Sequence, residues 1–138
     1  MLFSLSKSPL MSKKITLDIG YVEIHEHFAV GVLNEGIDLK TEENKYLLNV
    51  FRTEYQSKPF GFISNRVHSY SVDPTVYKET SELKNLMAIA VVISSPVQKL
   101  SIEIEKLFFN KPFEYFSSLE EAKAWMQNTI EHRINTTE

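Results

Sequence analysis

Polar side chains able to bind or react gather in one loop that follows an apolar run at residues 60–64. The loop ends at Asp73-Pro74, a strong signal for the start of a helix. In an open α/β sheet, ligands bind where strand ends meet helix starts, so this loop is the first candidate for a ligand or partner surface. With Glu35 from the end of a preceding strand, the candidate residues are Glu35, Ser64, Asn65, Arg66, His68, Ser69, Tyr70 and Ser71.

Two interpretations of this loop remain open. In the first, Arg66 and the free N–H groups at the start of the Pro74 helix hold an anion or a phosphorylated group. In the second, the residues are structural: Asp73 caps its helix, Arg66 pairs with Glu35, and Tyr70 packs as a lid. An aspartate at the cap would occupy the place of an anion and repel it.

The residue types required for catalysis are present, but their spacing is not that of a known motif. His68 lies near Ser64, Ser69 and Ser71, yet no Gly-x-Ser-x-Gly elbow is present. The four glycines are isolated, so there is no glycine-rich loop for phosphate. We therefore assign no catalytic residue, expect no cofactor, and favour a protein that is not an enzyme.

His25 and His27 are weak candidates for metal ligands. On a continuous strand they would share one face with Glu23, and two imidazoles with a carboxylate can bind zinc. The alternative is an exposed strand face without metal, and a turn within this stretch would destroy the spacing.

Composition restricts the class of protein. The 138 residues suit one domain, with 43% hydrophobic and 24% charged residues. A net charge of -3 argues against nucleic acid as a partner, and the absence of cysteine excludes disulfides and thiolate chemistry. No apolar run is long enough for a membrane span or a signal peptide, so we expect a cytoplasmic protein. Residues 1–13 are expected to be a flexible tail.

Periodicity predicts strands first and then alternating helices and strands. Two or three antiparallel strands are expected between residues 15 and 33, with a bulge or bend at Gly20. The expected order then continues with a helix from Thr41 carrying Leu47, Leu48, Phe51 and Tyr55 on one face, a strand at 60–64, a helix from Asp73 to about Lys84, a strand at 86–93, a helix after Ser95-Pro96, a strand at 113–116, and a helix from Ser118 to 133.

The helix after Pro96 has apolar residues on two sides. We expect Val97, Leu100, Ile104, Leu107 and Phe108 to form its inward face. Ile102 and Phe109 lie seven apart on another side, which is more apolar surface than one buried stripe requires. This extra surface predicts either a partner interface, including self-association, or a cover provided by the last helix or the N-terminal tail.

Strands connected by helices are expected to be parallel with right-handed crossovers. The sequence therefore predicts a single α/β domain over residues 14–133, with N-terminal antiparallel strands, a mixed and mostly parallel sheet and four helices. Residues 134–138 are expected to fray.

This order, together with the segment KPFEYFSSLEEAKAWM at residues 111–126, resembles the STAS superfamily. The similarity is to its small bacterial branch related to the sporulation anti-sigma-factor antagonist, the SpoIIAA-like proteins, in which a strand, an acidic helix start and an Ala-x-x-Trp pattern end the domain. The resemblance implies a four-helix α/β sandwich and a regulatory or binding role without enzymatic activity.

The chain departs from that family at the phosphorylation site. Family antagonists carry an Asp-Ser-Ser-Gly-Leu-like motif after a central strand, where a serine is phosphorylated. Here the corresponding residues are Ile63-Ser64-Asn65-Arg66, so the phosphoswitch is not carried over.

The leading hypothesis is a regulatory or binding domain that acts through protein–protein contact, including a homodimer, or through a small ligand. The alternative is an enzyme or a carrier of a small molecule, including a lipid, with a pocket near Arg66, His68 and Tyr70.

Overall fold

The computed structural model describes residues 12–136 and contains one six-stranded sheet. The strand order across the sheet is β1-β2-β3-β5-β7-β8. These strands are β1 (Lys13–Leu17), β2 (Gly20–Ile24), β3 (Phe28–Leu33), β5 (Phe60–Asn65), β7 (Leu86–Val92) and β8 (Phe113–Phe116). The helices are α1 (Thr41–Tyr55), α2 (Val76–Thr80), α3 (Gln98–Lys106) and α4 (Leu119–Thr136).

The sheet is mixed, as the sequence predicts. The pairs β1–β2 and β2–β3 are antiparallel, whereas β3–β5, β5–β7 and β7–β8 are parallel. Each parallel pair is joined by a segment that contains a helix, which is the connection that parallel strands require. The predicted fold class, N-terminal antiparallel strands followed by α-β-α-β-α-β-α, is therefore confirmed.

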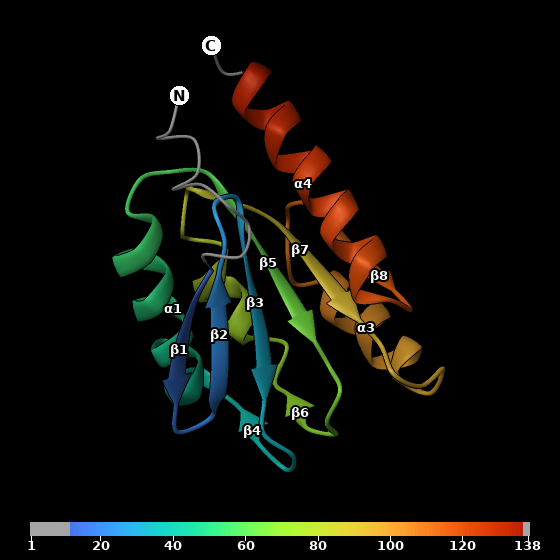
Figure 1. The fold of residues 1–138 in the computed structure, drawn as a ribbon. Coiled ribbons are helices and arrows are strands. Elements are labelled where there is room, and N and C mark those ends of the chain that lie inside the picture. Colours follow the sequence, from blue (N-terminus) through green and yellow to red (C-terminus); the bar gives the residue numbers. More distant parts are fainter. Residues whose placement is uncertain (1–11, 137–138) are drawn as a thin grey trace.

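The helices cover the two faces of the sheet unequally (Figure 1). Helices α1, α2 and α3 pack on one face, where Leu48, Phe51 and Ile102 join the larger hydrophobic core. Helix α4 packs alone on the other face, where Met126 contributes to a smaller core with Ile63. In Figure 1, α1 and α3 lie at opposite sides of the domain, with α3 beside the edge strand β8.

Most local predictions from the sequence are confirmed. The stripe Leu47, Leu48, Phe51 and Tyr55 of α1 is buried. Ser118 Oγ accepts the Glu121 N–H at 3.1 Å and begins α4 as a capping residue should. Helix α4 continues to Thr136, three residues past the expected end. Residues 1–11 of the expected tail lie outside the described residues, and Lys13 already belongs to β1.

Three local features differ from the expectation. Of the two alternatives expected at Gly20, the bulge is wrong and the chain bends beside it: residues 18–19 form the turn of a hairpin between β1 and β2. Gly20 has φ +150°, and a Cβ there would clash with the carbonyl oxygen of Val32. Helix α2 is shorter than expected, ending at Thr80. A second, two-stranded sheet of β4 (Asp38–Leu39) and β6 (Ser71–Val72) was not predicted.

No helix among residues 12–136 is long and apolar enough to cross a membrane.

Candidate functional site

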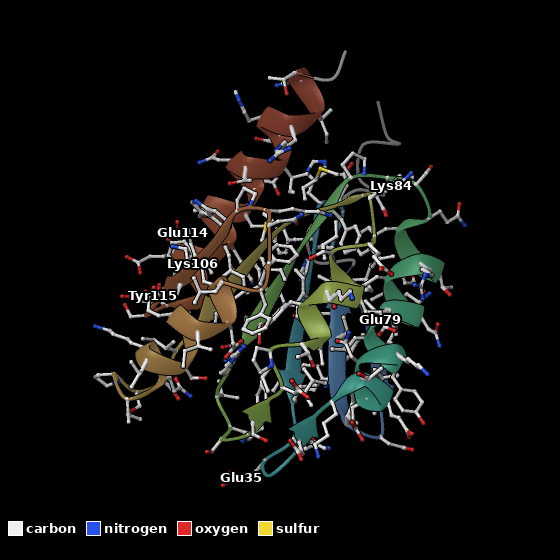
Figure 2. All side chains as sticks on the ribbon, turned by 180° about the vertical axis from the view of Figure 1, so that it is seen from behind. Glu35, Glu79, Lys84, Lys106, Glu114 and Tyr115 are labelled. Carbon is white, nitrogen blue, oxygen red and sulfur yellow. The ribbon has the colours of Figure 1, made fainter. Side chains whose placement is uncertain are left out.

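The loop that follows β5 does not gather its polar residues at one place. Ser64 and Arg66 are buried on the side of the sheet that α1, α2 and α3 cover, and Tyr70 joins them. Asn65 points to the other face, since successive strand residues alternate. The other four candidates are exposed, and the label of Glu35 in Figure 2 marks a loop tip at the end of the molecule: Glu35, His68, Ser69 and Ser71.

Two of the four exposed candidates, Ser69 and Ser71, have structural roles. Ser69 accepts the Gly36 N–H with its carbonyl oxygen, and the Ser71 hydroxyl donates to Asp38 at 2.7 Å. Both contacts hold the β5–α2 loop against the β3–α1 loop.

Arg66 forms a buried ion pair with Glu105 of α3. The guanidinium Nη1 and Nη2 donate to the two carboxylate oxygens at 2.8 and 2.6 Å, a bidentate geometry. Tyr77 of α2 donates its hydroxyl to the same carboxylate at 2.6 Å, and Ser101 donates at 3.1 Å. The expected pairing of Arg66 with Glu35 is therefore wrong, and the partner, Glu105, is not among the predicted site residues.

Ser64 and Tyr70 complete a polar cluster, which we call the Arg66–Glu105 network. Arg66 Nε donates to Ser64 Oγ at 3.3 Å, and the Ser64 and Tyr70 hydroxyls are 2.9 Å apart. The guanidinium carbon lies 5.5 Å from the centre of the Tyr70 ring. The network comprises Ser64, Arg66, Tyr70, Tyr77, Ser101 and Glu105, and it connects β5, the following loop, α2 and α3.

The two charges stay ionised although both are buried. Burial is the largest influence and lowers the pKa of the Arg66 guanidinium, but the hydrogen bonds to Glu105, together with the electrostatic effects of Tyr70, Tyr77 and Glu105, outweigh it, so the pKa lies above its usual value. Burial is the largest influence and raises the pKa of Glu105, but the hydrogen bonds and charge of Arg66, together with the hydrogen bonds from Tyr77 and Ser101, bring it below its usual value. Burial and the nearby Glu105 raise the pKa of Tyr77, which stays a hydrogen-bond donor.

An anion site was expected from the Arg66 guanidinium or from the free N–H groups at the start of the helix after Pro74, and neither is available to an anion. The Arg66 guanidinium is already neutralised by Glu105. Ahead of α2, the Asp73 carboxylate accepts the backbone N–H and the hydroxyl of Thr75 at 3.0 and 2.7 Å. These hydrogen bonds lower the pKa of Asp73, so a negative charge stands where an anion would bind.

A cavity beside the network is small. Its volume is about 30 Å³, enough for one or two water molecules. Ser64, Arg66 and Tyr70 line it together with apolar residues such as Leu47 and Phe51, whereas His68 does not. Of the three residues expected around a rim pocket, Arg66 and Tyr70 therefore share this small cavity and His68 lies outside it.

Helix α3 is oriented opposite to the expectation. Its buried residues are Ile102 and Glu105, followed by Phe109 after the helix end. The expected inward face is wrong, because all five of its residues are exposed: Val97, Leu100, Ile104, Leu107 and Phe108. One feature of the sequence indicates the observed orientation. Ile102 and Phe109 are seven residues apart, and Glu105 lies between them on the same side of the helix, which is the side that packs on the sheet.

We call these five residues the α3 outer face. Val97, Leu100 and Leu107 are 80%, 75% and 82% exposed. The backbone of Val97 and Leu107 is also helical, so the stripe follows one continuous helical surface. Beside it, Leu100, Glu103 and Tyr115 contribute to a shallow groove of about 450 Å³ between α3 and β8. Figure 2 shows Tyr115 on this side of the molecule, near Lys106 and Glu114.

This arrangement of sheet and helices is shared with a solved structure. That structure is an uncharacterised protein of the DUF3478 family from Shewanella loihica PV-4, described as having a SpoIIAA-like fold. The similarity covers 83% of this chain and 91% of that one, with a TM-score of 0.51 and 10% sequence identity. The fold is SpoIIAA-like. No protein-family profile matches the chain, and no curated protein matches it in sequence.

His25 and His27 lie at the other end of this SpoIIAA-like domain. Strand β2 ends at Ile24, and residues 25–27 form the turn before β3, so the strand spacing assumed for a metal site is lost. His25 Nε2 lies 3.6 Å from Glu23, whereas His27 Nδ1 lies 2.7 Å from Gln127. Both histidines line an open cleft of about 540 Å³. Within residues 12–136, no three His, Cys, Asp or Glu side chains are arranged to hold a metal ion.

Proposed function

We propose that this SpoIIAA-like domain is a regulatory binding module that acts through protein–protein contact and has no chemistry of its own. The observation that carries the proposal is the α3 outer face. Seven large hydrophobic side chains are exposed among residues 12–136, and five of them belong to this one surface. A concentration of exposed apolar side chains on one helix is typical of an interaction site, whereas isolated ones are ordinary.

The way α3 is held on the sheet supports this role. Its inner face buries Ile102 and Phe109, and a buried carboxylate lies between them. The pairing of Glu105 with Arg66 fixes the rotation of the helix, because any other rotation would leave a charge buried without its partner. The more apolar side of α3 is thus directed to solvent, where it contributes little to folding and is available to a partner.

The positions of Ser64 and His68 support a role without catalysis. The Ser64 hydroxyl is buried and bonded to Tyr70, whereas His68 is exposed in the loop beyond Arg66. A serine nucleophile requires a base within hydrogen-bonding distance, and Ser64 has a phenol and a guanidinium there instead.

A photo-crosslinking experiment tests the proposal. A photoreactive amino acid is placed at Leu100 or Leu107, and the protein is irradiated in its native cells. The control position is Asn49, an exposed residue of α1 on the other side of the domain. We expect discrete adducts from the α3 positions and none from Asn49. Equal labelling at all three positions, or none at any, would refute contact through α3.

A further inference from the structure

The α3 outer face has the spacing of a helix–helix seam. Val97, Leu100, Ile104 and Leu107 follow one another at intervals of three, four and three residues, which is the a/d pattern of paired helices. Ile102 and Glu105 occupy the opposite side of the same helix and contact the domain's own core and network. One helix therefore presents two packing faces, and only the inner one is occupied within the chain.

We propose that the occupant of the outer face is a second copy of this chain, with the two α3 helices antiparallel about a twofold axis. The inference rests on the proposed function and names its partner. An axis near residue 102 places Val97 opposite Leu107 of the second copy and Leu100 opposite its Ile104, so every seam position meets an apolar residue. A twofold interface requires such self-complementarity, because the same patch serves both subunits.

The charges beside the seam are compatible with self-association. Lys99 lies 6.0 Å from the centre of the Tyr115 ring, and Glu103 lines the same groove. On the same flank, which faces β8, Lys106 Nζ is 4.0 Å from a Glu114 oxygen (Figure 2). Two cations and two anions leave no net charge, so two copies of this surface meet without electrostatic repulsion.

The exposed area suits a reversible dimer. From their exposed fractions, the five residues of the α3 outer face present roughly 600 Å² per chain. Two copies would together bury up to about 1,200 Å², the lower limit for specific interfaces. We therefore expect association that depends on protein concentration.

Light scattering after size exclusion, at about 10 to about 500 µM protein, tests the proposal. We expect the mass to rise from 16.0 kDa toward twice that value. Leu100→Glu and Leu107→Glu place charges in the seam and should hold the protein at the single-chain mass. Tyr46→Glu, at an exposed apolar residue of α1, is the matched control and should dimerise like the wild type.

Cysteine pairing tests the antiparallel geometry, because the chain has no cysteine of its own. Mixed Val97→Cys and Leu107→Cys chains should form a disulfide with each other under mild oxidation. Val97→Cys alone should not, because ten residues of helix separate its two sites by about 15 Å along the axis. A disulfide between two Val97→Cys chains would refute the antiparallel arrangement.

Two results would overturn the dimer. One is a wild type that stays at 16.0 kDa over the whole range, and the other is a dimer that persists in Leu100→Glu. If the wild type is monomeric while a crosslinker at Leu100 captures a different protein, self-association is wrong and the proposed function stands. If neither a dimer nor an adduct forms, both are wrong.

Discussion

The buried ion pair between Arg66 and Glu105 yields the sharpest prediction, concerning Glu105→Ala. The substitution removes a carboxylate that accepts two hydrogen bonds from Arg66 and one each from Tyr77 and Ser101. It also leaves the Arg66 guanidinium buried, with two long hydrogen bonds, 3.3 Å to Ser64 and 3.5 Å to Tyr77. Removing one member of a buried pair costs about 3–5 kcal/mol, and we expect about 4 kcal/mol here.

The assay is urea unfolding, followed by circular dichroism and by the fluorescence of Trp125. Trp125 is the chain's one tryptophan, and its ring lies 5.6 Å from that of Phe116 on the α4 side, away from the substitution. With a denaturant slope of about 1.5 kcal/mol per M, the expected loss lowers the urea midpoint by about 2–3 M. Coincident curves from the two probes justify a two-state free energy of unfolding.

Two further variants make the test specific. Arg66→Met combined with Glu105→Leu replaces both charges by apolar groups, so the double variant should be within about 2 kcal/mol of the wild type. Lys106→Ala, which removes an exposed pair on the same helix, should cost less than about 1 kcal/mol. A loss below about 1 kcal/mol in Glu105→Ala would refute the reasoning. So would a double variant whose loss equals the sum of the losses in the single variants Arg66→Met and Glu105→Leu.

Three other predictions concern positions outside the network. Burial and the nearby Lys123 lower the pKa of His25 from 6.5, so protonation favours the unfolded chain: stability is full above about pH 6.5 and falls as the pH decreases toward the folded pKa. The urea midpoint should therefore drop more between pH 7.5 and 5.5 in the wild type than in His25→Gln, and equal drops would contradict this. Gly20→Ala should lower the free energy of unfolding by about 1–3 kcal/mol through backbone strain alone, and the clash with Val32 should add to this loss. The loss is measured as a decrease in melting temperature. Tyr55→Phe removes a buried 2.9 Å hydrogen bond to the His25 carbonyl oxygen and should cost about 1 kcal/mol in urea unfolding; an unchanged midpoint would argue against that bond.

Much of the fold could be predicted because its signals are local. The α1 stripe repeats at helical spacing, and the buried parallel strand β7 is a continuous apolar run. Ser118 marks the start of α4. Each of these signals acts within a few residues, so the order of elements and the class of sheet follow without knowledge of tertiary contacts.

The small sheet of β4 and β6 had no such signal. Its strands are two residues each and lie more than 30 positions apart in the chain, so periodicity cannot detect them. The turn at His25 likewise depends on the pairing of β2 with β3 and separates two histidines that a continuous strand would have aligned.

The sequence could not show which of the candidate residues lie together, because sequence neighbours in a strand and a loop point in different directions. Ser64 and Arg66 join the buried network, whereas His68 lies in solvent. Glu105, the residue that determines the state of Arg66, lies 39 positions away in the chain.

Helix α3 separates most clearly what the sequence determines from what only tertiary structure decides. The sequence determines that the segment is a helix with apolar residues on two sides, because side-chain spacing is a local property. Which side packs on the sheet depends on where Arg66 lies, and that position exists only once β5 has paired with its neighbours. A buried arginine requires a carboxylate partner, so Glu105 turns inward and the α3 outer face remains in solvent.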